Sequence, residues 1–315
     1  MALAFSLAAL AADKPPRINL ASQFQQLGYE EVELRRSGEN RLYLFGRLNG
    51  RKLSVLVDSG WSFTTVSPNA ASHLKLAHRL DLPPGDPFPG SNAPGAVVVL
   101  ERLRLGRIEF TNQPALVQDL AFNGRPAPFQ IVAGCDFLIR NSAVVDCSNR
   151  RLYTRQKDLS HSQRSQLETE LRRGGFVPLD LKRTAPLALI AAAQLNGKLA
   201  NLLVDTGGVW SCLDAGVATS LGLQLLPTPR RITGAGATGQ RGFAVAGVGT
   251  MEVGGATFRN VNFAVMELGD WGLGPSGAAL ADVGGILGAP ELAAGQALVD
   301  CAGMVLWLKS PTVRR

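Results

Sequence analysis

The sequence predicts an all-β protein, mainly strands with a few short helices, that is built from two copies of one unit. Glycine (35 residues) and proline (18) are too frequent for a helical bundle and are typical of a chain with many turns. Short β-branched or leucine-rich runs are separated by Gly, Pro and Asn, as is usual for strands. The third observation is a duplication that covers most of the 315 residues.

The duplication consists of segments that align at a nearly constant spacing. Residues 27–76 align without a gap on residues 174–223, at an offset of 147 positions. Towards the end of each copy, Val132-Ala133-Gly134 matches Ile286-Leu287-Gly288 at an offset of 154, so the second copy carries seven extra residues. A period this long indicates two duplicated domains and not a solenoid of short repeats.

The two copies define the expected domain organisation. Lobe one spans residues 27–155 and lobe two spans residues 174–309. Residues 156–173 link them, and this linker contains good helix formers from Ser160 onward and ends at Gly174, which predicts a short exposed helix. The remaining segments are expected to be a signal-peptide remnant, an N-terminal extension and a C-terminal tail, at residues 1–12, 13–26 and 310–315.

Within each copy, strands are expected to alternate with one or two short helices. In lobe one the apolar runs predict strands at residues 53–57, 97–105 and 131–132, with counterparts in lobe two. Residues 70–76 and 217–223 are each expected to form about two helical turns. In lobe two, Asn196-Gly197 is typical of a two-residue hairpin turn in which both central residues have positive φ.

The composition excludes several classes of protein. Hydrophobic residues make up 46% of the chain and charged residues 18%, so it can bury a core and is not a disordered polar tail. The net charge of +7 comes from scattered short basic runs, which predicts no nucleic-acid surface. His73, His78 and His161 are the three histidines and no cysteines are closely spaced, so neither a metal site nor a cofactor is expected. The longest later apolar run, residues 185–195, falls short of the roughly 20 residues of a membrane span.

The N-terminus and the cysteines bear on the cellular compartment. Residues 1–12 are apolar and contain Ala9-Leu10-Ala11, which resembles a secretory cleavage site, so export to the periplasm or the medium is expected. A disordered tail is the alternative. The four cysteines (Cys135, Cys147, Cys212 and Cys301) could form disulfides in an oxidising compartment or remain buried thiols.

One chemical motif occurs at the same place in both copies. The strand at 53–57 runs into Asp58-Ser59-Gly60, and its counterpart at 200–204 runs into Asp205-Thr206-Gly207. Such a strand would carry a carboxylate to its buried end, while the hydroxyl donates a hydrogen bond and the glycine permits a tight turn. A single such tripeptide could be an ordinary aspartate turn. Two of them in register across a duplication indicate a functional pair of carboxyls.

These motifs resemble those of the retropepsin-like aspartic proteases, with both halves fused in one chain as in the bilobed layout of pepsin. The resemblance covers nearly all of residues 27–309 and includes the apolar-apolar-Gly elements at 132–138 and 286–292. It implies two barrel-like lobes related by a pseudo-two-fold axis in a monomer. It also implies an aspartic endopeptidase that needs no metal or cofactor and acts on peptide or protein substrates. Asp58 and Asp205 would share one proton and activate a water molecule.

The resemblance also implies roles for neighbouring residues. Ser59 and Thr206 would interlock across the lobe interface, while Gly60 and Gly207 support the two loops. A mobile hairpin that closes over substrate would lie at Thr233, Gly234, Ala235, Gly236 and Ala237, with a second flap or a fixed loop at residues 84–95. The string G-x-G-x-x-G in this region lacks the preceding strand and following helix of a dinucleotide site, so nucleotide binding is not expected.

Three positions, Trp61, Pro290 and Glu291, depart from the family pattern. Gly208 is small, as usual after the motif, but Trp61 is large, so it either lines the substrate cleft or turns into the core. Pro290-Glu291 stands where Gly-x-Asp is expected. Cys147 and Cys301 occupy equivalent positions in the last strand of each copy, which permits an interlobe disulfide.

A non-catalytic peptide-binding or scaffold protein that keeps the fold is the chief alternative function, and a β-rich structural protein is a third.

Overall fold

The computed structural model describes residues 18–82, 95–120, 127–184, 187–232, 241–271 and 282–309. Several predicted features lie outside these residues. They are the signal segment (1–12), the flap at Thr233 to Ala237, nearly all of the second flap candidate (84–95) and the tail (310–315).

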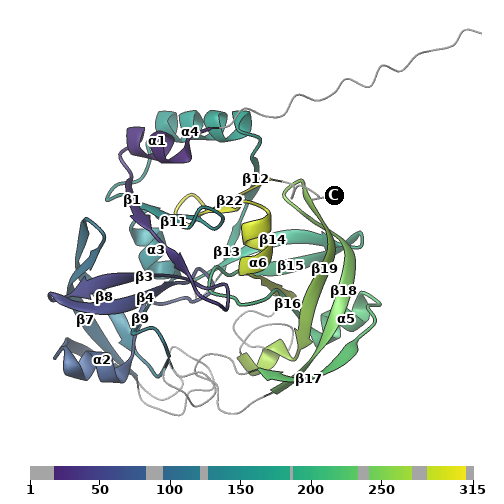
Figure 1. The fold of residues 1–315 in the computed structure, drawn as a ribbon, viewed down its shortest axis with the longest axis horizontal. Helices are drawn as coiled ribbons and strands as arrows, with labels where there is room; N and C mark the ends of the chain where they lie inside the picture. Colours follow the sequence, from purple (N-terminus) through teal and green to yellow (C-terminus); the bar gives the residue numbers. More distant parts are fainter. Residues whose placement is uncertain are drawn as a thin grey trace, which may run out of the picture.

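Lobe one is a closed eight-stranded sheet, seen on the left of Figure 1. The strand order is β2-β3-β4-β9-β5-β8-β7-β6, and an additional pairing of β3 with β7 closes it. Inward-facing and outward-facing residues alternate along β3, so that a single face of the sheet meets the core. The strands are β2 (Arg35–Arg36), β3 (Leu42–Leu48), β4 (Arg51–Val57), β5 (Thr65–Val66), β6 (Ala77–Leu82), β7 (Gly95–Leu105), β8 (Ile108–Val117) and β9 (Ile131–Ala133).

Lobe two repeats this topology strand for strand. Its order is β13-β14-β15-β20-β16-β19-β18-β17, closed by the pairing of β14 with β18. Asn196 and Gly197 join β14 to β15 with φ values of 48° and 81°, as the hairpin prediction requires. The strands are β13 (Lys182–Thr184), β14 (Ala188–Leu195), β15 (Lys198–Val204), β16 (Cys212–Asp214), β17 (Leu226–Ile232), β18 (Arg241–Val253), β19 (Ala256–Met266) and β20 (Gly285–Leu287).

A six-stranded sheet joins the lobes, and each half of the chain contributes three strands to it. The order is β1-β11-β10-β21-β22-β12, with β10 and β21 antiparallel at the centre. Val145 pairs there with Val299, its own counterpart in the duplication, so a pseudo-two-fold axis passes between them. The strands are β1 (Glu30–Glu33), β10 (Val144–Asp146), β11 (Arg151–Thr154), β12 (Val177–Asp180), β21 (Leu298–Asp300) and β22 (Val305–Leu308).

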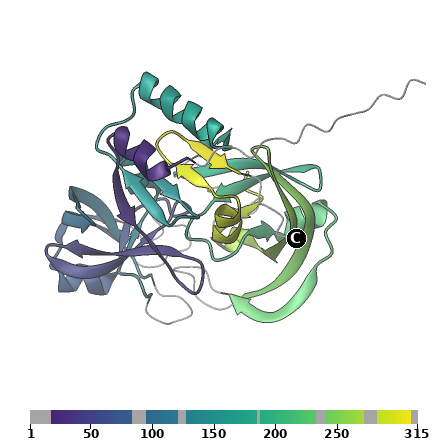
Figure 2. The same cartoon turned by 45° about the horizontal axis from the view of Figure 1, so that its top comes forward.

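Short helices cover the ends and one side of the sheets. α1 and α4 lie beside the shared sheet, at the top of Figures 1 and 2. Phe24 of α1 is completely buried and stacks on Tyr153 with ring centroids 4.2 Å apart, so the N-terminal helix is fixed to the interface. The helices are α1 (Leu20–Gln26), α2 (Pro68–His73), α3 (Cys135–Arg140), α4 (His161–Arg173), α5 (Ala215–Ser220) and α6 (Ala289–Ala294), with the 3₁₀ turn η1 (Leu268–Trp271).

The helices α2 and α5 begin and end two to three residues earlier than the sequence predicts. The side chain of Ser67 accepts a hydrogen bond from the backbone of Ala70, and Pro68 follows it in the first turn. Asp214 caps α5 in the same way through the backbone N–H groups of Gly216 and Val217. Because the capping residue fixes where a helix starts, Leu74 and Leu221 become the C-cap residues, and Leu76 and Leu223 lie beyond the helices.

The cysteines are free, and all four are buried. The register of β10 with β21 does not allow the interlobe disulfide between Cys147 and Cys301 that the sequence permitted. Cys147 bonds to the backbone of Ala297 and Cys301 to that of Ala143, four positions away along the central strand pair. At about 3.4 Å per residue the two cysteine backbones are about 13 Å apart, about twice the separation that a disulfide tolerates.

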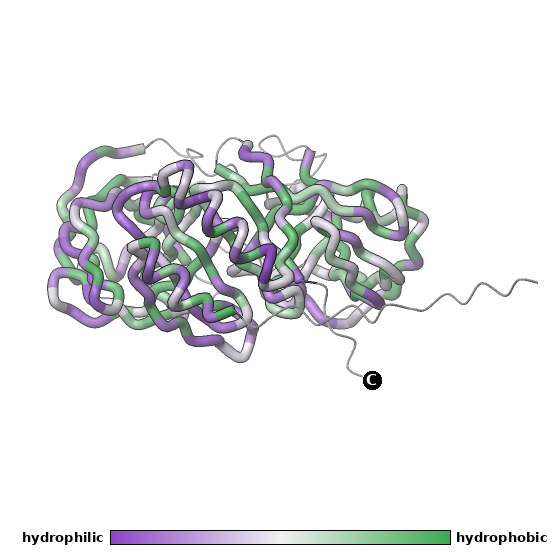
Figure 3. Tube along the Cα trace, turned by 90° about the horizontal axis from the view of Figure 1, so that it is seen from above, coloured by the Kyte–Doolittle hydropathy of each residue, from purple (hydrophilic) through white to green (hydrophobic). Residues whose placement is uncertain are grey.

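The main core is continuous through both lobes and the shared sheet. Figure 3 shows the chain from above, with hydrophobic and hydrophilic stretches interspersed throughout the molecule. A second cluster around Phe24, Tyr153 and Trp307 lies between the shared sheet and helices α1 and α4. In the part of the chain that the structure describes, no helix has the length and apolar character needed to cross a membrane.

Candidate active site

Asp58 and Asp205 follow the buried strands β4 and β15 and lie where the two lobes meet. Each is anchored by its backbone N–H, which donates to Ala133 in lobe one and to Leu287 in lobe two, at 3.1 and 3.0 Å. The loops are so close that a Cβ placed on Gly60 would come within 2.5 Å of the Asp205 carboxyl carbon. A Cβ on Gly207 would collide with the Asp58 carboxyl in the same way. Glycine is required at both positions by this close approach.

The two carboxyl groups share a hydrogen bond, so one of them carries a proton. Burial raises the pKa of Asp58 well above its usual range, and the charge of Asp205 and the shared hydrogen bond raise it further. Burial also raises the pKa of Asp205. The hydrogen bond from Asp58 opposes that rise, because it stabilises the Asp205 carboxylate. The pair therefore favours a proton on Asp58 and a negative charge on Asp205.

The backbone around the pair reinforces this asymmetry. The N–H of Gly207 donates to Asp205 Oδ1 at 2.8 Å, and the N–H of Gly208 adds a second hydrogen bond that lowers the Asp205 pKa. On the other side, Gly60 donates to Asp58 Oδ1 at 3.0 Å. Backbone N–H groups stabilise the charged form of a carboxyl. Two backbone N–H groups stabilise the Asp205 carboxylate and one stabilises that of Asp58, so Asp205 is the better site for the negative charge.

Arg41 is a charged neighbour of the pair that the sequence analysis missed. It lowers the pKa of both aspartates, and its side chain is only 11% exposed. The β3–β4 register pairs Tyr43 with Leu56, and its continuation by two residues sets Arg41 opposite Asp58. The matching position in lobe two is the buried Ala188. The signal for Arg41 was present in the sequence, because a hairpin at Asn49-Gly50 fixes which residue faces Asp58.

Ser59 and Thr206 connect the two loops through reciprocal hydrogen bonds across the lobe interface. The Ser59 hydroxyl donates to the carbonyl of Val204 at 2.7 Å and accepts from the N–H of Thr206 at 3.1 Å. The Thr206 hydroxyl donates to the carbonyl of Val57 at 2.9 Å and accepts from the N–H of Ser59 at 3.1 Å. Both side chains are completely buried. Each hydroxyl thus satisfies one N–H and one carbonyl of the opposite loop.

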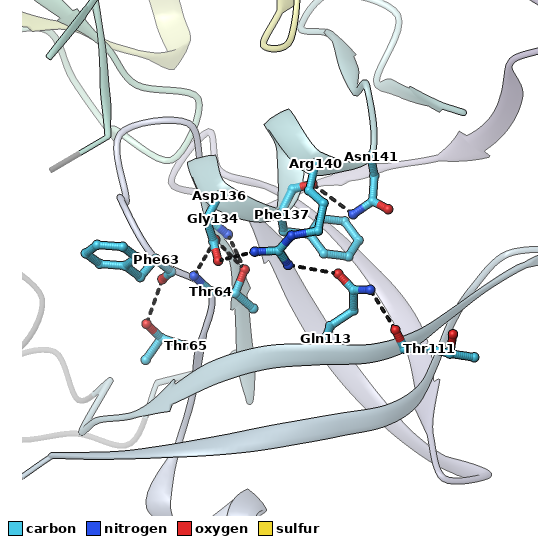
Figure 4. Close-up of polar contacts among 10 residues, drawn as sticks. All are labelled: Phe63, Thr64, Thr65, Thr111, Gln113, Gly134, Asp136, Phe137, Arg140 and Asn141. Atoms are coloured by element: carbon cyan, nitrogen blue, oxygen red, sulfur yellow. Dashed lines mark hydrogen bonds and ion pairs between the residues drawn. The ribbon is translucent and has the colours of Figure 1, made fainter. Parts of the chain in front are cut away.

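A second layer of polar contacts supports the lobe-one loop (Figure 4). Asp136 at the start of α3 accepts from the backbone and the hydroxyl of Thr64 at 2.6 and 2.7 Å. Arg140 lies 3.6 Å from the other Asp136 oxygen and donates to Gln113 of β8 at 3.1 Å. A Cβ on Gly134 would lie 2.7 Å from the backbone of this loop, so the glycine lets α3 pack directly beneath it.

Lobe two builds the same support with different residues. Ser211 occupies the place of Thr64, and its hydroxyl hydrogen-bonds the carboxyl of Glu291 and accepts from the backbone of Gly288 at 2.9 Å. Glu291 is one position later in its helix than Asp136, and its longer side chain spans the difference. The Pro290-Glu291 departure in sequence thus preserves the contact in structure.

Trp61 lines an apolar pocket beside Asp58. Its indole N–H donates to the Thr65 hydroxyl at 2.8 Å, which holds the ring against the pocket wall. The pocket has a volume of about 270 Å³, its open mouth included. Trp61 also packs against the buried cluster of Leu56, Leu120, Phe129 and Val132, and its role in a substrate cleft stays a prediction. The lining residues are Leu56, Asp58, Trp61, Leu120, Ala127, Phe129 and Val132.

Gly208 takes the place of Trp61 in lobe two. A Cβ there would lie 2.9 Å from an Asp205 carboxyl oxygen, so a larger residue would crowd the carboxylate.

The candidate flap residues Thr233, Gly234, Ala235, Gly236 and Ala237 lie outside the described residues. Across the ranges that the structure describes, no three His, Cys, Asp or Glu side chains gather as metal ligands.

Comparisons with known proteins agree with this geometry. A family model described as aspartyl protease matches residues 45–137 and 191–290, more than half of the chain, and these ranges contain both aspartates. The crystal structure of an aspartic proteinase from Irpex lacteus is similar over 90% of this chain and 98% of its own, with 14% identity and a TM-score of 0.50. The predicted bilobed β fold is thereby confirmed. No curated protein matches the chain.

Two further solved structures are more distant. Basic 7S globulin from soybean matches 89% of this chain and 94% of its own, with 13% identity and a TM-score of 0.46. A retropepsin-like aspartic protease from Rickettsia conorii matches 40% of this chain and 90% of its own, with 18% identity and a TM-score of 0.29.

Proposed function

Because this chain belongs to the aspartyl protease family, we propose that it is an aspartic endopeptidase that hydrolyses peptide bonds in peptides or proteins. The observation that carries the proposal is the pair formed by the buried Asp58 and the partly buried Asp205, which share a hydrogen bond between two equivalent loops. Placing two carboxyls with one negative charge together at a mostly buried point is costly, and a protein that only binds peptides gains nothing from it. Peptide hydrolysis requires an acid and a base at one point.

In the proposed mechanism Asp205 is the base and Asp58 the acid. The Asp205 carboxylate removes a proton from a water molecule as the water oxygen bonds to the peptide carbonyl carbon, and Asp58 gives its proton to the carbonyl oxygen. The C–N bond of the resulting diol then breaks. Asp205 returns its proton to the departing nitrogen, and Asp58 recovers a proton from a diol hydroxyl. One water molecule is consumed, and both carboxyls return to their starting states.

The surroundings of the pair support this division of roles. The N–H groups of Gly207 and Gly208 stabilise the charge on Asp205, and the hydrogen bond from Asp58 does the same. The interlocked Ser59 and Thr206 hold the loops in a fixed geometry. Such rigidity matters because a misplacement of about 1 Å in a catalytic group can cost about 10²-fold in rate.

Peptide cleavage by the full chain tests the proposal. A mixed peptide library is incubated with the wild type between roughly pH 3 and 8, a range that brackets carboxyl titration. Asp58→Asn and Asp205→Asn should each lower kcat by about 10²-fold or more. The matched control is Asp180→Asn, which removes an exposed carboxyl from the edge strand β12 of the shared sheet.

Circular dichroism of each variant ensures that lost cleavage reflects lost chemistry and not lost folding. A wild type that cuts no peptide across this pH range would favour the alternative of a non-catalytic peptide-binding protein. Full activity in either aspartate variant would rule out the two-carboxyl mechanism.

A further inference from the structure

The outer face of the lobe-one sheet gathers basic residues that are scattered in the sequence. In the strand register, Arg47 on β3 is directly opposite Lys52 on β4 and Arg104 on β7, and all three are exposed. Neighbouring strands are about 4.8 Å apart, so three positive charges lie within about 10 Å. Like charges at directly opposed positions destabilise a sheet. A negatively charged partner would offset this repulsion between the three cations.

Two more cations extend the row into a basic face, defined here as Arg35, Arg47, Lys52, Arg102 and Arg104. Arg102 is two residues before Arg104 on β7 and is exposed on the same side. Arg35 on β2 pairs with Tyr43, which shares a side of β3 with Arg47. Glu109 is opposite Arg104 on β8 and offsets one of these five charges. The face keeps a clear positive excess.

Phe45 lies within the basic face and is 43% exposed, although it is large and apolar. The Arg35 guanidinium is 5.0 Å from the ring centroid and the Lys52 ammonium 4.6 Å. These two cations come from the strands on either side of β3, so they flank the ring from both sides. The ring also meets Tyr43 edge-to-face with centroids 5.8 Å apart, and 43% of the side chain stays exposed.

Lobe two shows that the fold does not require this surface. The register of β14 with β15 and β18 places Gln194, Leu199 and Glu252 at the positions of Arg47, Lys52 and Arg104. Ala192 stands in the place of Phe45. At the positions equivalent to the five residues of the basic face, the same sheet therefore carries one acidic residue and one cation, Lys182 in the place of Arg35. The basic face is a property of lobe one alone.

We propose that the basic face docks lobe one onto an anionic phospholipid surface, with Phe45 reaching the boundary between headgroups and acyl chains. Clustered Lys and Arg side chains are attracted to anionic lipids, and an apolar side chain among them adds burial at the membrane interface. A single-stranded nucleic acid would instead need the open face of an aromatic ring for base stacking. Both sides of Phe45 are flanked by cations, which favours lipid over nucleic acid. The proposal is independent of catalysis.

Co-sedimentation of the full chain with lipid vesicles tests the proposal. The probes are vesicles of phosphatidylcholine alone and of phosphatidylcholine mixed with phosphatidylglycerol, at low and at physiological ionic strength. The wild type should bind the anionic vesicles and not the neutral ones, and added salt should weaken the binding. Replacing Arg47, Lys52 and Arg104 together by Gln should weaken binding by at least tenfold, since each cation near such a surface contributes about fivefold.

A second triple variant provides the matched control. Replacing Lys198, Arg259 and Arg172 by Gln removes the same total charge from exposed positions elsewhere. It should weaken binding by less than about threefold, since those positions are off the basic face. Separately, Phe45→Trp should gain fluorescence quenching by bromine-labelled acyl chains.

Three outcomes would overturn the proposal. They are no binding to anionic vesicles at low salt, equal losses in the two triple variants, and binding to a single-stranded oligonucleotide in preference to vesicles. Peptide cleavage should be unchanged in both triple variants, so a failure here leaves the proposed hydrolase standing.

Discussion

The two aspartates have the same position in each repeat but different immediate surroundings. Asp205 is held by the N–H groups of Gly207 and Gly208, while lobe one places the bulky Trp61 where lobe two has Gly208. Arg41 adds a positive charge from the lobe-one side, where the equivalent lobe-two residue is alanine. Duplication supplied two identical acids, and these neighbouring substitutions give them different affinities for a proton.

The raised pKa of Asp58 predicts a pH-dependent cost to stability. Asp58 is protonated in the folded protein but ionised in the unfolded chain above about pH 3.9, so its contribution to stability is fully present below that pH and is lost as pH rises towards its folded pKa. Asp58→Asn removes this loss of stability at higher pH, because an asparagine side chain does not ionise. The variant should exceed the wild type in free energy of unfolding at pH 7, and the gap should shrink on acidification, by about 1.4 kcal/mol per pH unit between the folded and the unfolded pKa.

Urea unfolding at pH 7, 5.5 and about 4 measures this gap. The control is Asp180→Asn, whose carboxyl is exposed. A stability difference between Asp58→Asn and wild type that is the same at all three pH values would contradict the protonation assigned to Asp58.

Trp61 is expected to select which peptides are cut. Trp61→Ala enlarges the apolar pocket beside Asp58, so cleavage should move towards peptides with a larger apolar side chain next to the scissile bond. One or two added methylenes in such a pocket change kcat/KM by about 10- to 200-fold. Cleavage-site profiling of a peptide library measures the change, with Phe45→Ala as a control aromatic outside the cleft. An unchanged profile would reject the pocket role.

At the scale of elements, the loops after β4 and β15 depend on each other. Ser59 and Thr206 each satisfy a buried N–H and a buried carbonyl in the opposite loop, so neither loop has a complete set of partners alone. Beneath them, α3 and α6 provide a second support through Asp136 and Glu291. The site is therefore a property of two loops and two helices packed together.

Loss of one interlocking hydroxyl should weaken both stability and catalysis. Thr206→Val keeps the shape but leaves the Ser59 N–H and the Val57 carbonyl without their partner. The free energy of unfolding should fall by about 2–4 kcal/mol, since each buried unsatisfied group costs about 1–3 kcal/mol. Thr206→Ser retains the hydroxyl and should cost less than about 1.5 kcal/mol. Chemical denaturation gives both values, and equal losses in Val and Ser variants would show that packing, not the hydroxyl, matters.

At the scale of the whole molecule, the shared sheet and the continuous core make the lobes a single structure. β10 and β21 pair at the centre, with the other two strands of the first half on one side and those of the second half on the other, in a symmetric order. The thiols of Cys135, Cys147 and Cys301 are buried within this common core. Burial raises the pKa of Cys135 and of Cys212 to about 12, which keeps both thiols protonated at neutral pH.

The four cysteines should be unreactive until the protein unfolds. A thiol reagent such as dithionitrobenzoate should react with none of the thiols in the native protein, because the reactive thiolate is absent and the sites are inaccessible. In denaturant all four should react. Fewer than four reactive thiols in denaturant without reductant would indicate a disulfide and contradict the register of β10 and β21.

The duplication made most of the fold predictable, because the same strand signals recur at a fixed offset. The hairpin at Asn196-Gly197 and the paired aspartate motifs followed from local residue types alone. The helix boundaries at α2 and α5 were wrong because Ser67 and Asp214 act as caps, which outweigh apolar periodicity. Arg41 could be placed only by extending the register of the Asn49-Gly50 hairpin to Asp58. Glu291 and the basic face depend on side-chain reach and on pairing between several strands, which local residue types do not reveal.

The pairing of Val145 with Val299 places equivalent strands of the two repeats against each other. Such a contact is isologous, since each partner offers the same surface to the other. A half-length chain that ends after β11 would therefore expose a strand that is already shaped to join a second copy of itself. Fusion of the repeats makes this assembly independent of concentration and frees each half to change separately.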